Sequence, residues 1–480
     1  MRIRYLLTGV LLGVVTLGAQ APDRSKLPTP GSAPTLKLPA IQKRQLSNGL
    51  PVWIVELHEV PVVQVNLVVS SGSADDPAGK YGVASMTADM LENGAGARSA
   101  LDIADAIDFL GASLATSSGS DSTAVRLHVP VGRLTDALPI MADVALRPAF
   151  PKDELERLRQ ERLTTILQAR NDPAAIVGLT FSRVVYGTSH RFGTAIMGTA
   201  QTIKALTIDD LRAFYASRYR PDNATLLVVG DVTPDKVLPV LESQFGKWKS
   251  QGAAPAHVTF PEPRASGPRE VILVDKPGAP QSQIRIGWVG VPRSTPDYFP
   301  LQVMNTVLGG SFTSRLNMNL RENHGYTYGA ASVFDMRIAA GPFYATAGVQ
   351  TDKTADALKE FLNELNGILQ VIPEDELTRA KHYVALGFPE RFETTGDIST
   401  NLENLVVYHL PDDHFSKYVQ NILGVTAADA QRVARKYILP DRVAVVVVGD
   451  LKSIEPPIRA VSLGAVRILT IDEIFGPPPR

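Results

Sequence analysis

The feature that most limits the fold of this 480-residue chain is an internal repeat. The segment PDNATLLVVGD at 221–231 matches PDRVAVVVVGD at 440–450, and the two lie 219 positions apart. A Thr-x-x-Asp motif recurs at the same offset, beginning at Thr207 and at Thr426, and each copy is expected to cap the helix that leads into the repeated strand. Because such matches keep their order along the chain, the sequence contains two copies of one unit.

The repeat defines the domain organisation. The two units span 41–250 and 269–460, and the segment 251–268 between them has the Pro-, Gly- and Ser-rich composition of a linker. Residues 461–480 remain as a C-terminal tail. A composition of 44% hydrophobic and 20% charged residues is typical of a soluble globular protein with a sizeable core.

Each unit combines strands and helices. Residues 62–70 and 124–130 alternate like half-buried strands, whereas 226–231 and 443–450 are continuous apolar runs typical of central strands. Helical spacing occurs at 100–110, 131–145, 151–170 and 207–217. These patterns predict an α+β fold in which each unit is a mostly antiparallel sheet with helices on one face. Two such units are expected to form a clamshell around a chamber.

The N-terminus has the pattern of a secretory signal peptide. Arg2 and Arg4 precede an apolar run at 6–17, and an Ala-Gln-Ala sequence follows. The run is shorter than the ~20 residues that a membrane-spanning helix needs. We therefore expect residues 1–21 to be removed, residues 22–40 to form a linker, and the protein to reside in a bacterial periplasm without a stable membrane span.

Charge and cysteine content exclude further classes. The 48 basic and 49 acidic side chains nearly cancel, which argues against a nucleic-acid partner. The absence of cysteine excludes disulfides, which a chain of this length does not need in order to build a core.

The segment YGVASMTADMLENG at 81–94 predicts a helix whose polar face lacks the ligands of a metal site. Ser85, Ala88 and Asp89 share that face, and Asp89 is the only ionisable group among them. The eight histidines of the chain are scattered, and the densest pair, His409 with His414, is interpreted as part of a solvated loop.

This segment resembles the zinc-binding helix of the insulinase/pitrilysin metallopeptidases, an inverzincin family that includes processing peptidases and carries H-x-x-E-H. Ser85 and Asp89 correspond to the two histidine ligands, and Ala88 corresponds to the glutamate base. The family's third ligand, a glutamate, falls at Thr165, with Glu161 about one turn earlier. Zinc hydrolysis needs three protein ligands, an open water position and a base, so the resemblance implies a degenerate zinc site that holds no metal.

The resemblance continues in the second unit, at LGGSFTSRLNMNLRENHGYTYG, residues 308–329. In the family this region begins with a glycine-rich loop. The loop corresponds to Gly309, Gly310 and Ser311, which are expected to bind substrate because the two glycines let the backbone approach a peptide closely.

The family's functional pair in this region is an arginine followed seven residues later by a tyrosine, which corresponds to Arg321 and Tyr328. Gly325 is expected to reverse the chain between them. The resemblance implies that both side chains donate hydrogen bonds to a substrate carbonyl and to the oxyanion of the tetrahedral intermediate. The alternative is structural: Arg321 would form an internal ion pair and Tyr328 would lie at the edge of the core.

The resemblance as a whole implies a noncatalytic, substrate-binding subunit of a heterodimeric periplasmic zinc metalloendopeptidase. The chain would bind peptide but no cofactor, and zinc would belong to a homologous H-x-x-E-H partner without which the chain is inactive. One alternative is a structural or binding core subunit of an envelope or membrane-associated complex with no peptidase role. A third hypothesis is an independent peptidase with a rebuilt metal site.

Overall fold

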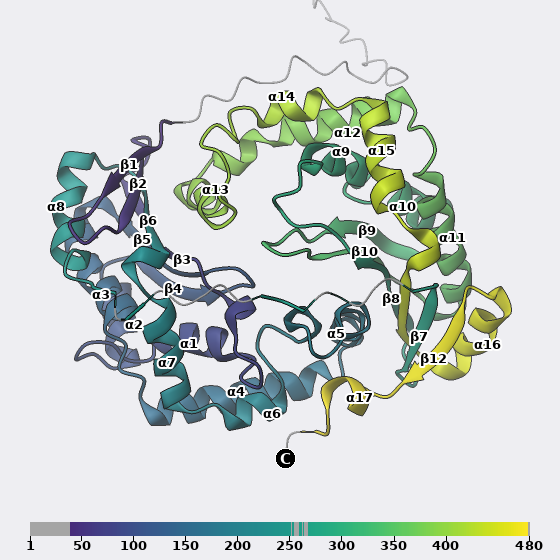
Figure 1. Ribbon diagram of the computed structural model, residues 1–480, viewed down its shortest axis with the longest axis horizontal. Helices are drawn as coiled ribbons and strands as arrows, with labels where there is room; N and C mark the ends of the chain where they lie inside the picture. The colour runs from purple at the N-terminus through teal and green to yellow at the C-terminus, as the bar shows by residue number, and fades with distance from the viewer. Residues whose placement is uncertain (1–38, 251, 254–258, 262, 264–266, 479–480) are drawn as a thin grey trace, which may run out of the picture.

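The computed structural model describes residues 39–250, 252–253, 259–261, 263 and 267–478. The expected signal peptide, all but two residues of the linker 22–40 and part of the linker 251–268 lie outside the described residues. The described chain forms two six-stranded sheets, one in each copy of the repeat. Figure 1 shows the two halves as the sides of a clamshell, with the N-terminal half on the left and the C-terminal half on the right.

The N-terminal half contains six strands, which are β1 (Gln42–Gln45), β2 (Pro51–Glu56), β3 (Val62–Val69), β4 (Ser113–Ser118), β5 (Thr123–Pro130) and β6 (Ala224–Gly230). Its helices are α1 (Val83–Leu91), α2 (Ala100–Phe109), α3 (Leu134–Leu146), α4 (Lys152–Ala169), α5 (Pro173–Tyr186), α6 (Ala200–Ala205), α7 (Ile208–Arg218) and α8 (Pro234–Phe245).

The strands of the C-terminal half are β7 (Glu270–Asp275), β8 (Gln281–Val289), β9 (Thr327–Phe334), β10 (Pro342–Gln350), β11 (Ala444–Gly449) and β12 (Ala465–Leu469). Its helices are α9 (Tyr298–Leu308), α10 (Arg315–Asn317), α11 (Thr354–Gly367), α12 (Glu374–Gly387), α13 (Thr395–Val407), α14 (Tyr418–Leu423), α15 (Ala427–Tyr437), α16 (Leu451–Val461) and α17 (Ile471–Phe475). A π-helical turn, Met318–Asn323, follows α10.

The two sheets repeat one topology. The first has the order β1-β2-β6-β3-β5-β4 and the second the order β12-β7-β11-β8-β10-β9, so five strands correspond one to one. Most pairs of neighbouring strands are antiparallel, as predicted. The repeated runs form β6 and β11, the third strand of each sheet. The repeated Thr-x-x-Asp motifs close capping boxes on α7 and α15, which confirms the helix starts expected at Thr207 and Thr426.

The sixth strand differs between the sheets. In the first sheet β1 precedes β2 and pairs with it antiparallel, whereas in the second β12 comes from residues 465–469 and pairs parallel to β7. Residues 465–475, which the sequence left in a tail, therefore belong to the fold as β12 and α17. The strand is short and mostly exposed, so it lacks the apolar alternation that marks a strand in sequence.

Each central strand is apolar on both faces because the two halves exchange a helix. On β6, Leu226 and Val228 pack into the core of the N-terminal half, whereas Leu227 and Val229 pack into a core that also contains Leu402 of α13. In return, α5 of the N-terminal half packs on β8 and β11. Figure 1 shows α13 beside the first sheet and α5 beside the second. Each unit's own helices cover one face of its sheet, as expected, and the second face is covered by the other unit.

A buried polar contact fixes α13 on the first sheet. The Glu403 carboxylate accepts two hydrogen bonds from Arg126 of β5, at 2.9 and 2.6 Å, and one from Asn66 of β3, at 2.7 Å. These donors satisfy a carboxylate that would otherwise be costly to bury. Within the described ranges, no helix has both the length and the apolar character needed to cross a bilayer.

Candidate functional site

The helix predicted at 81–94 is α1, and its polar face contacts an arginine of α4. Nη1 of Arg162 donates a hydrogen bond to Ser85 Oγ at 2.9 Å, and Nη2 donates to Asp89 Oδ2 at 2.6 Å. Arg162 is buried, Asp89 is half-buried, and Ala88 lies fully inside the core. A guanidinium group therefore lies between the two positions to which the resemblance assigns the histidine ligands of zinc.

This group of side chains does not fit zinc. The ion needs three protein ligands, whereas Ser85 and Asp89 offer one hydroxyl and one carboxylate, both already bonded to a cation. The fixed positive charge of Arg162 also opposes a second cation at the same place. Ala88 has no group that accepts a proton from water. In the part of the chain that the structure describes, no group of three or more His, Cys, Asp or Glu side chains is arranged to hold a metal ion.

The side chain of α4 that bonds to Ser85 and Asp89 is that of Arg162, not that of Thr165. Thr165 is exposed, and its hydroxyl donates at 3.0 Å to the carbonyl oxygen of Glu161 on its own helix. Glu161 is also exposed and pairs with Arg157 at 2.6 Å. Arg162 lies three residues before Thr165 and points toward α1 instead. Three residues are less than one helical turn of 3.6 residues, so the two side chains point in different directions, with Arg162 buried and Thr165 exposed.

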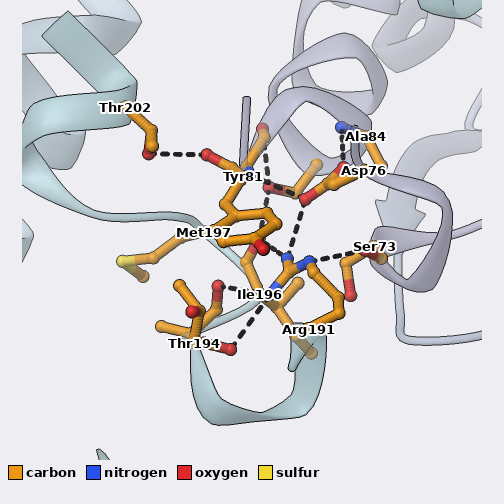
Figure 2. A network of polar contacts seen from close by, with 12 residues as sticks. Ser73, Asp76, Tyr81, Ala84, Arg191, Thr194, Ile196, Met197 and Thr202 are labelled. Carbon is orange, nitrogen blue, oxygen red and sulfur yellow. Dashed lines mark hydrogen bonds and ion pairs between the residues drawn. The ribbon is translucent and has the colours of Figure 1, made fainter. Parts of the chain in front are cut away.

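A buried ion pair positions the start of α1 (Figure 2). The helix begins after Gly82, which has no side chain to cap it, and the Asp76 carboxylate accepts hydrogen bonds from the backbone N–H groups of Gly82 at 2.6 Å and Ala84 at 2.8 Å. Arg191 donates to the same carboxylate at 2.7 Å and to the Ser73 carbonyl at 2.7 Å. Burial raises the pKa of the Asp76 carboxyl, and the Arg191 charge and the two N–H donors offset part of that effect.

The same arginine organises the loop beside Ser85. Arg191 donates further hydrogen bonds to the carbonyl oxygens of Thr194, at 3.0 Å, and Ile196, at 3.3 Å. The Ile196 carbonyl also accepts from Ser85 Oγ at 3.3 Å. Figure 2 shows the guanidinium of Arg191 enclosed by this loop and the start of α1. Asp76, Arg191 and Arg162 were not identified from the sequence, although all three are needed to describe the site.

The position of Arg162 predicts how a zinc site is rebuilt. A variant with Ser85→His, Asp89→His and Arg162→Glu is expected to bind about one equivalent of zinc, because it places two imidazoles and one carboxylate where three side chains already converge. The protein is incubated with zinc and dialysed to remove unbound metal, and metal analysis then measures the zinc-to-protein ratio. The unaltered chain is the reference.

The matched control moves the carboxylate to the position expected from the sequence. Ser85→His, Asp89→His and Thr165→Glu keep the Arg162 guanidinium at the site and direct the new carboxylate to solvent, so this variant is expected to bind no zinc. Zinc bound to the Thr165→Glu variant, with none bound to the Arg162→Glu variant, would show that residue 162 is not the right position for a third zinc ligand.

Arg321 lies in the π-helical turn and Tyr328 in β9, on opposite sides of a chain reversal. Gly325 has φ +66°, as the expected turn requires, and its N–H donates to the Arg321 carbonyl at 3.0 Å. The Arg321 guanidinium stacks on the Phe312 ring, 4.4 Å from its centroid, and Nε lies 3.4 Å from a carboxylate oxygen of Glu322. The residue Tyr328 is 89% exposed. π-Helical turns are rare and occur frequently at functional sites.

The glycine-rich loop has an internal role that the sequence did not indicate. A Cβ on Gly309 would lie 2.3 Å from the Ser332 backbone nitrogen of β9, so close packing of the loop on its own sheet requires glycine there. A Cβ on Gly310 would meet the Thr306 Cα at 3.0 Å. Ser311 donates to the Thr306 carbonyl at 3.2 Å. Gly310 and Ser311 also line a pocket, so the substrate-binding role predicted for them stays a prediction.

The histidine pair does not form a unit. His409 adopts a positive φ of 50° in a turn, whereas the His414 ring is half-buried and stacks on Phe299. Burial, with a smaller contribution from Arg293, lowers the pKa of His414 to about 4. Nε2 of His414 faces the Arg293 guanidinium at 3.1 Å and accepts a hydrogen bond from it in the neutral form. The interpretation of this stretch as a solvated loop is therefore wrong for His414, which is part of the packed structure.

Comparison with known proteins gives matches to one peptidase family in both halves. A family model described as "Insulinase (Peptidase family M16)" matches residues 52–189. A second model, described as "Peptidase M16 inactive domain", matches residues 205–384.

Individual proteins cover most of the chain. An uncharacterized zinc protease of Mycobacterium leprae is 28% identical over 342 residues, which is 71% of this chain and 76% of the relative. The crystal structure of a peptidase M16 inactive domain from Pseudomonas fluorescens has a TM-score of 0.79 at 26% identity and covers 85% of this chain and 98% of its own. A protease from Helicobacter pylori has the same fold, with a TM-score of 0.78 at 22% identity, covering 86% of this chain and 100% of its own.

Proposed function

This chain belongs to the insulinase (M16) peptidase family, and from that premise we propose that it is the noncatalytic, substrate-binding subunit of a heterodimeric zinc endopeptidase. The partner is a homologous subunit that carries H-x-x-E-H and the zinc ion. The pair acts on peptides in a bacterial periplasm, after export directed by residues 1–21. This chain contributes hydrogen-bond donors to the peptide and no metal.

The observation that carries the proposal is the Arg162 guanidinium between Ser85 and Asp89. A cation bound covalently to the chain lies between the two side chains to which the resemblance assigns the histidine ligands of zinc. The charge of the site is thereby balanced without metal, and α1 stays attached to α4. The N-terminal half keeps the frame of a peptidase site, whereas the means of activating water must come from another chain.

The second support is the accessibility of Arg321 and Tyr328. A tyrosine with a structural role at a core edge would be largely covered, but the residue Tyr328 is 89% exposed. The ion pair of Arg321 with Glu322 joins two partly exposed side chains and is weak, about 0–1 kcal/mol, so the guanidinium is available to a ligand. The Phe312 ring holds the guanidinium in place from one side.

The proposed chemistry of this pair follows from its donors. The Arg321 guanidinium presents several N–H groups in a rigid fork, and the Tyr328 hydroxyl presents one O–H group. Both donate to the carbonyl oxygen of the peptide bond to be cleaved, and the bonds strengthen as that oxygen gains negative charge. Arg321 and Tyr328 also orient the peptide, which lowers the entropic part of the barrier.

Reconstitution tests the proposal. The chain purified from a periplasmic extract is expected to lack residues 1–21, to contain no stoichiometric zinc and to cleave no peptide. Addition of a purified H-x-x-E-H homologue from the same organism is expected to form a complex and produce peptidase activity beyond that of the homologue alone. Activity and bound zinc in the isolated chain would overturn the proposal. A stable complex without any gain in activity would favour the structural subunit instead.

A further inference from the structure

A pocket of about 1090 Å³ lies next to the glycine-rich loop and has no role in the function proposed so far. Its lining comes from α9, the segment 310–318, α12, Glu390 and Arg391 after it, and Asp397 at the start of α13. The volume lies just above the usual range of small-ligand sites, about 300–1,000 Å³, so the pocket has room for more than one side chain of a peptide.

The wall contains exposed apolar side chains. Met318 is 37% exposed, Tyr383 is 59% exposed and Leu386 is 38% exposed, and all three line the pocket. Single exposed apolar residues are ordinary on a soluble protein, but several around one concave surface mark a binding site. Tyr383 and Leu386 lie one turn apart on α12 and therefore present one apolar strip to the opposite wall.

The charged groups of the pocket balance one another. They are three arginines and three acids, Arg315, Arg379, Arg391, Glu376, Glu390 and Asp397. Nε of Arg315 lies 2.7 Å from a carboxylate oxygen of Glu376, so this pair is neutral as a unit. The lining therefore does not select an anionic or a cationic ligand, and the apolar strip determines what binds.

The pocket and the Arg321 site are formed by the same stretch of chain, although Arg321 itself does not line the pocket. Met318 belongs to the same π-helical turn as Arg321. Phe312, whose ring supports the Arg321 guanidinium, lies between Ser311 and Thr313, which both line the pocket. A peptide that places a carbonyl oxygen at Arg321 therefore has the pocket beside it, along the same stretch of backbone.

We propose that this pocket binds aromatic or aliphatic side chains of the extended peptide whose carbonyl oxygen Arg321 holds, so that the chain selects apolar segments of unfolded polypeptides. The inference rests on the proposed function, since it takes the peptide as the occupant. It adds a specificity site, formed mainly by α12, to the hydrogen-bonding pair.

The test uses the full chain without a partner. Two short flexible peptides carry a fluorescent label and differ only in having Phe and Leu or Ser at two central positions, and fluorescence anisotropy measures their dissociation constants. We expect the Phe/Leu peptide to bind more tightly to the unaltered chain. The double variant Tyr383→Ser, Leu386→Ser is expected to bind that peptide about 10-fold more weakly and to leave binding of the Ser peptide unchanged.

The control double variant is Leu101→Ser, Phe109→Ser, which removes two exposed apolar side chains of α2 on the other half of the molecule. It is expected to bind both peptides like the unaltered chain. All four substituted residues are solvent-accessible, so thermal unfolding midpoints are expected to stay unchanged and to exclude misfolding as a cause.

Equal binding of the two peptides, or equal loss in both double variants, would overturn the inference. So would a pocket variant that keeps its preference for the Phe/Leu peptide but no longer associates with the H-x-x-E-H partner in gel filtration, because the pocket would then be a subunit interface. Failure of the proposed function is distinguishable: the isolated chain would still discriminate the peptides, while the reconstituted complex would show no gain in activity.

Discussion

Arg321→Ala is expected to lower the peptidase rate of the reconstituted complex on the order of 100-fold, with the larger change in kcat. The guanidinium donates to an oxygen whose negative charge grows toward the transition state, so its loss raises the barrier more than it weakens ground-state binding. Steady-state kinetics on a fluorogenic peptide, with the partner in excess, separate kcat from KM.

Two further variants define the cause of the change. Arg321→Lys keeps the charge but loses the planar fork, so an intermediate rate is expected. Arg133→Ala removes a more exposed arginine, paired with Asp136 on the surface of the N-terminal half, and is expected to leave the rate unchanged. If Arg321→Ala were as active as Arg133→Ala, Arg321 would have no part in the reaction.

Arg191→Met is expected to lower the free energy of unfolding by about 3–5 kcal/mol. The ion pair that it breaks is almost fully buried, with exposed fractions of 5% for the Arg191 side chain and 0% for Asp76. Removal of the guanidinium leaves the Asp76 carboxylate buried without its counter-charge and deprives the Ser73 carbonyl of a donor. Urea unfolding followed by circular dichroism measures the change.

The control is Arg157→Met, which breaks exposed ion pairs on α4 and is expected to cost less than about 1 kcal/mol. The double variant Arg191→Met, Asp76→Asn removes the uncompensated charge and is expected to recover part of the lost stability. Equal losses for Arg191→Met and Arg157→Met would show that the buried pair does not stabilise the fold.

The sequence predicts those parts of the fold that depend on local patterns. β6 and β11 are identifiable because each is an apolar run that follows a capped helix, and the repeat marks them twice. The exchange of α5 and α13 could not be predicted, because it depends on which helix packs against which sheet between segments that lie at least 95 residues apart, as Tyr186 and Gln281 do. The continuous apolar character of β6 indicates only that some partner covers its second face.

The candidate site also has a part that could be predicted from the sequence and a part that could not. The loss of the histidines and the glutamate is visible at Ser85, Ala88 and Asp89, but their new partner is not, because Arg162 lies on a different helix. A signal was present: Arg162 falls between Leu158 and Ile166 on the buried face of α4, where an arginine is unusual and must find hydrogen-bond acceptors.

The exchange of α5 and α13 means that neither half can bury both faces of its sheet alone. A single copy of the repeated unit would expose one apolar face of its sheet to solvent, and its exchanged helix would have no sheet to pack against. Each half therefore completes its two-sided packing only with the help of the other, and their covalent connection keeps the two surfaces together at any protein concentration.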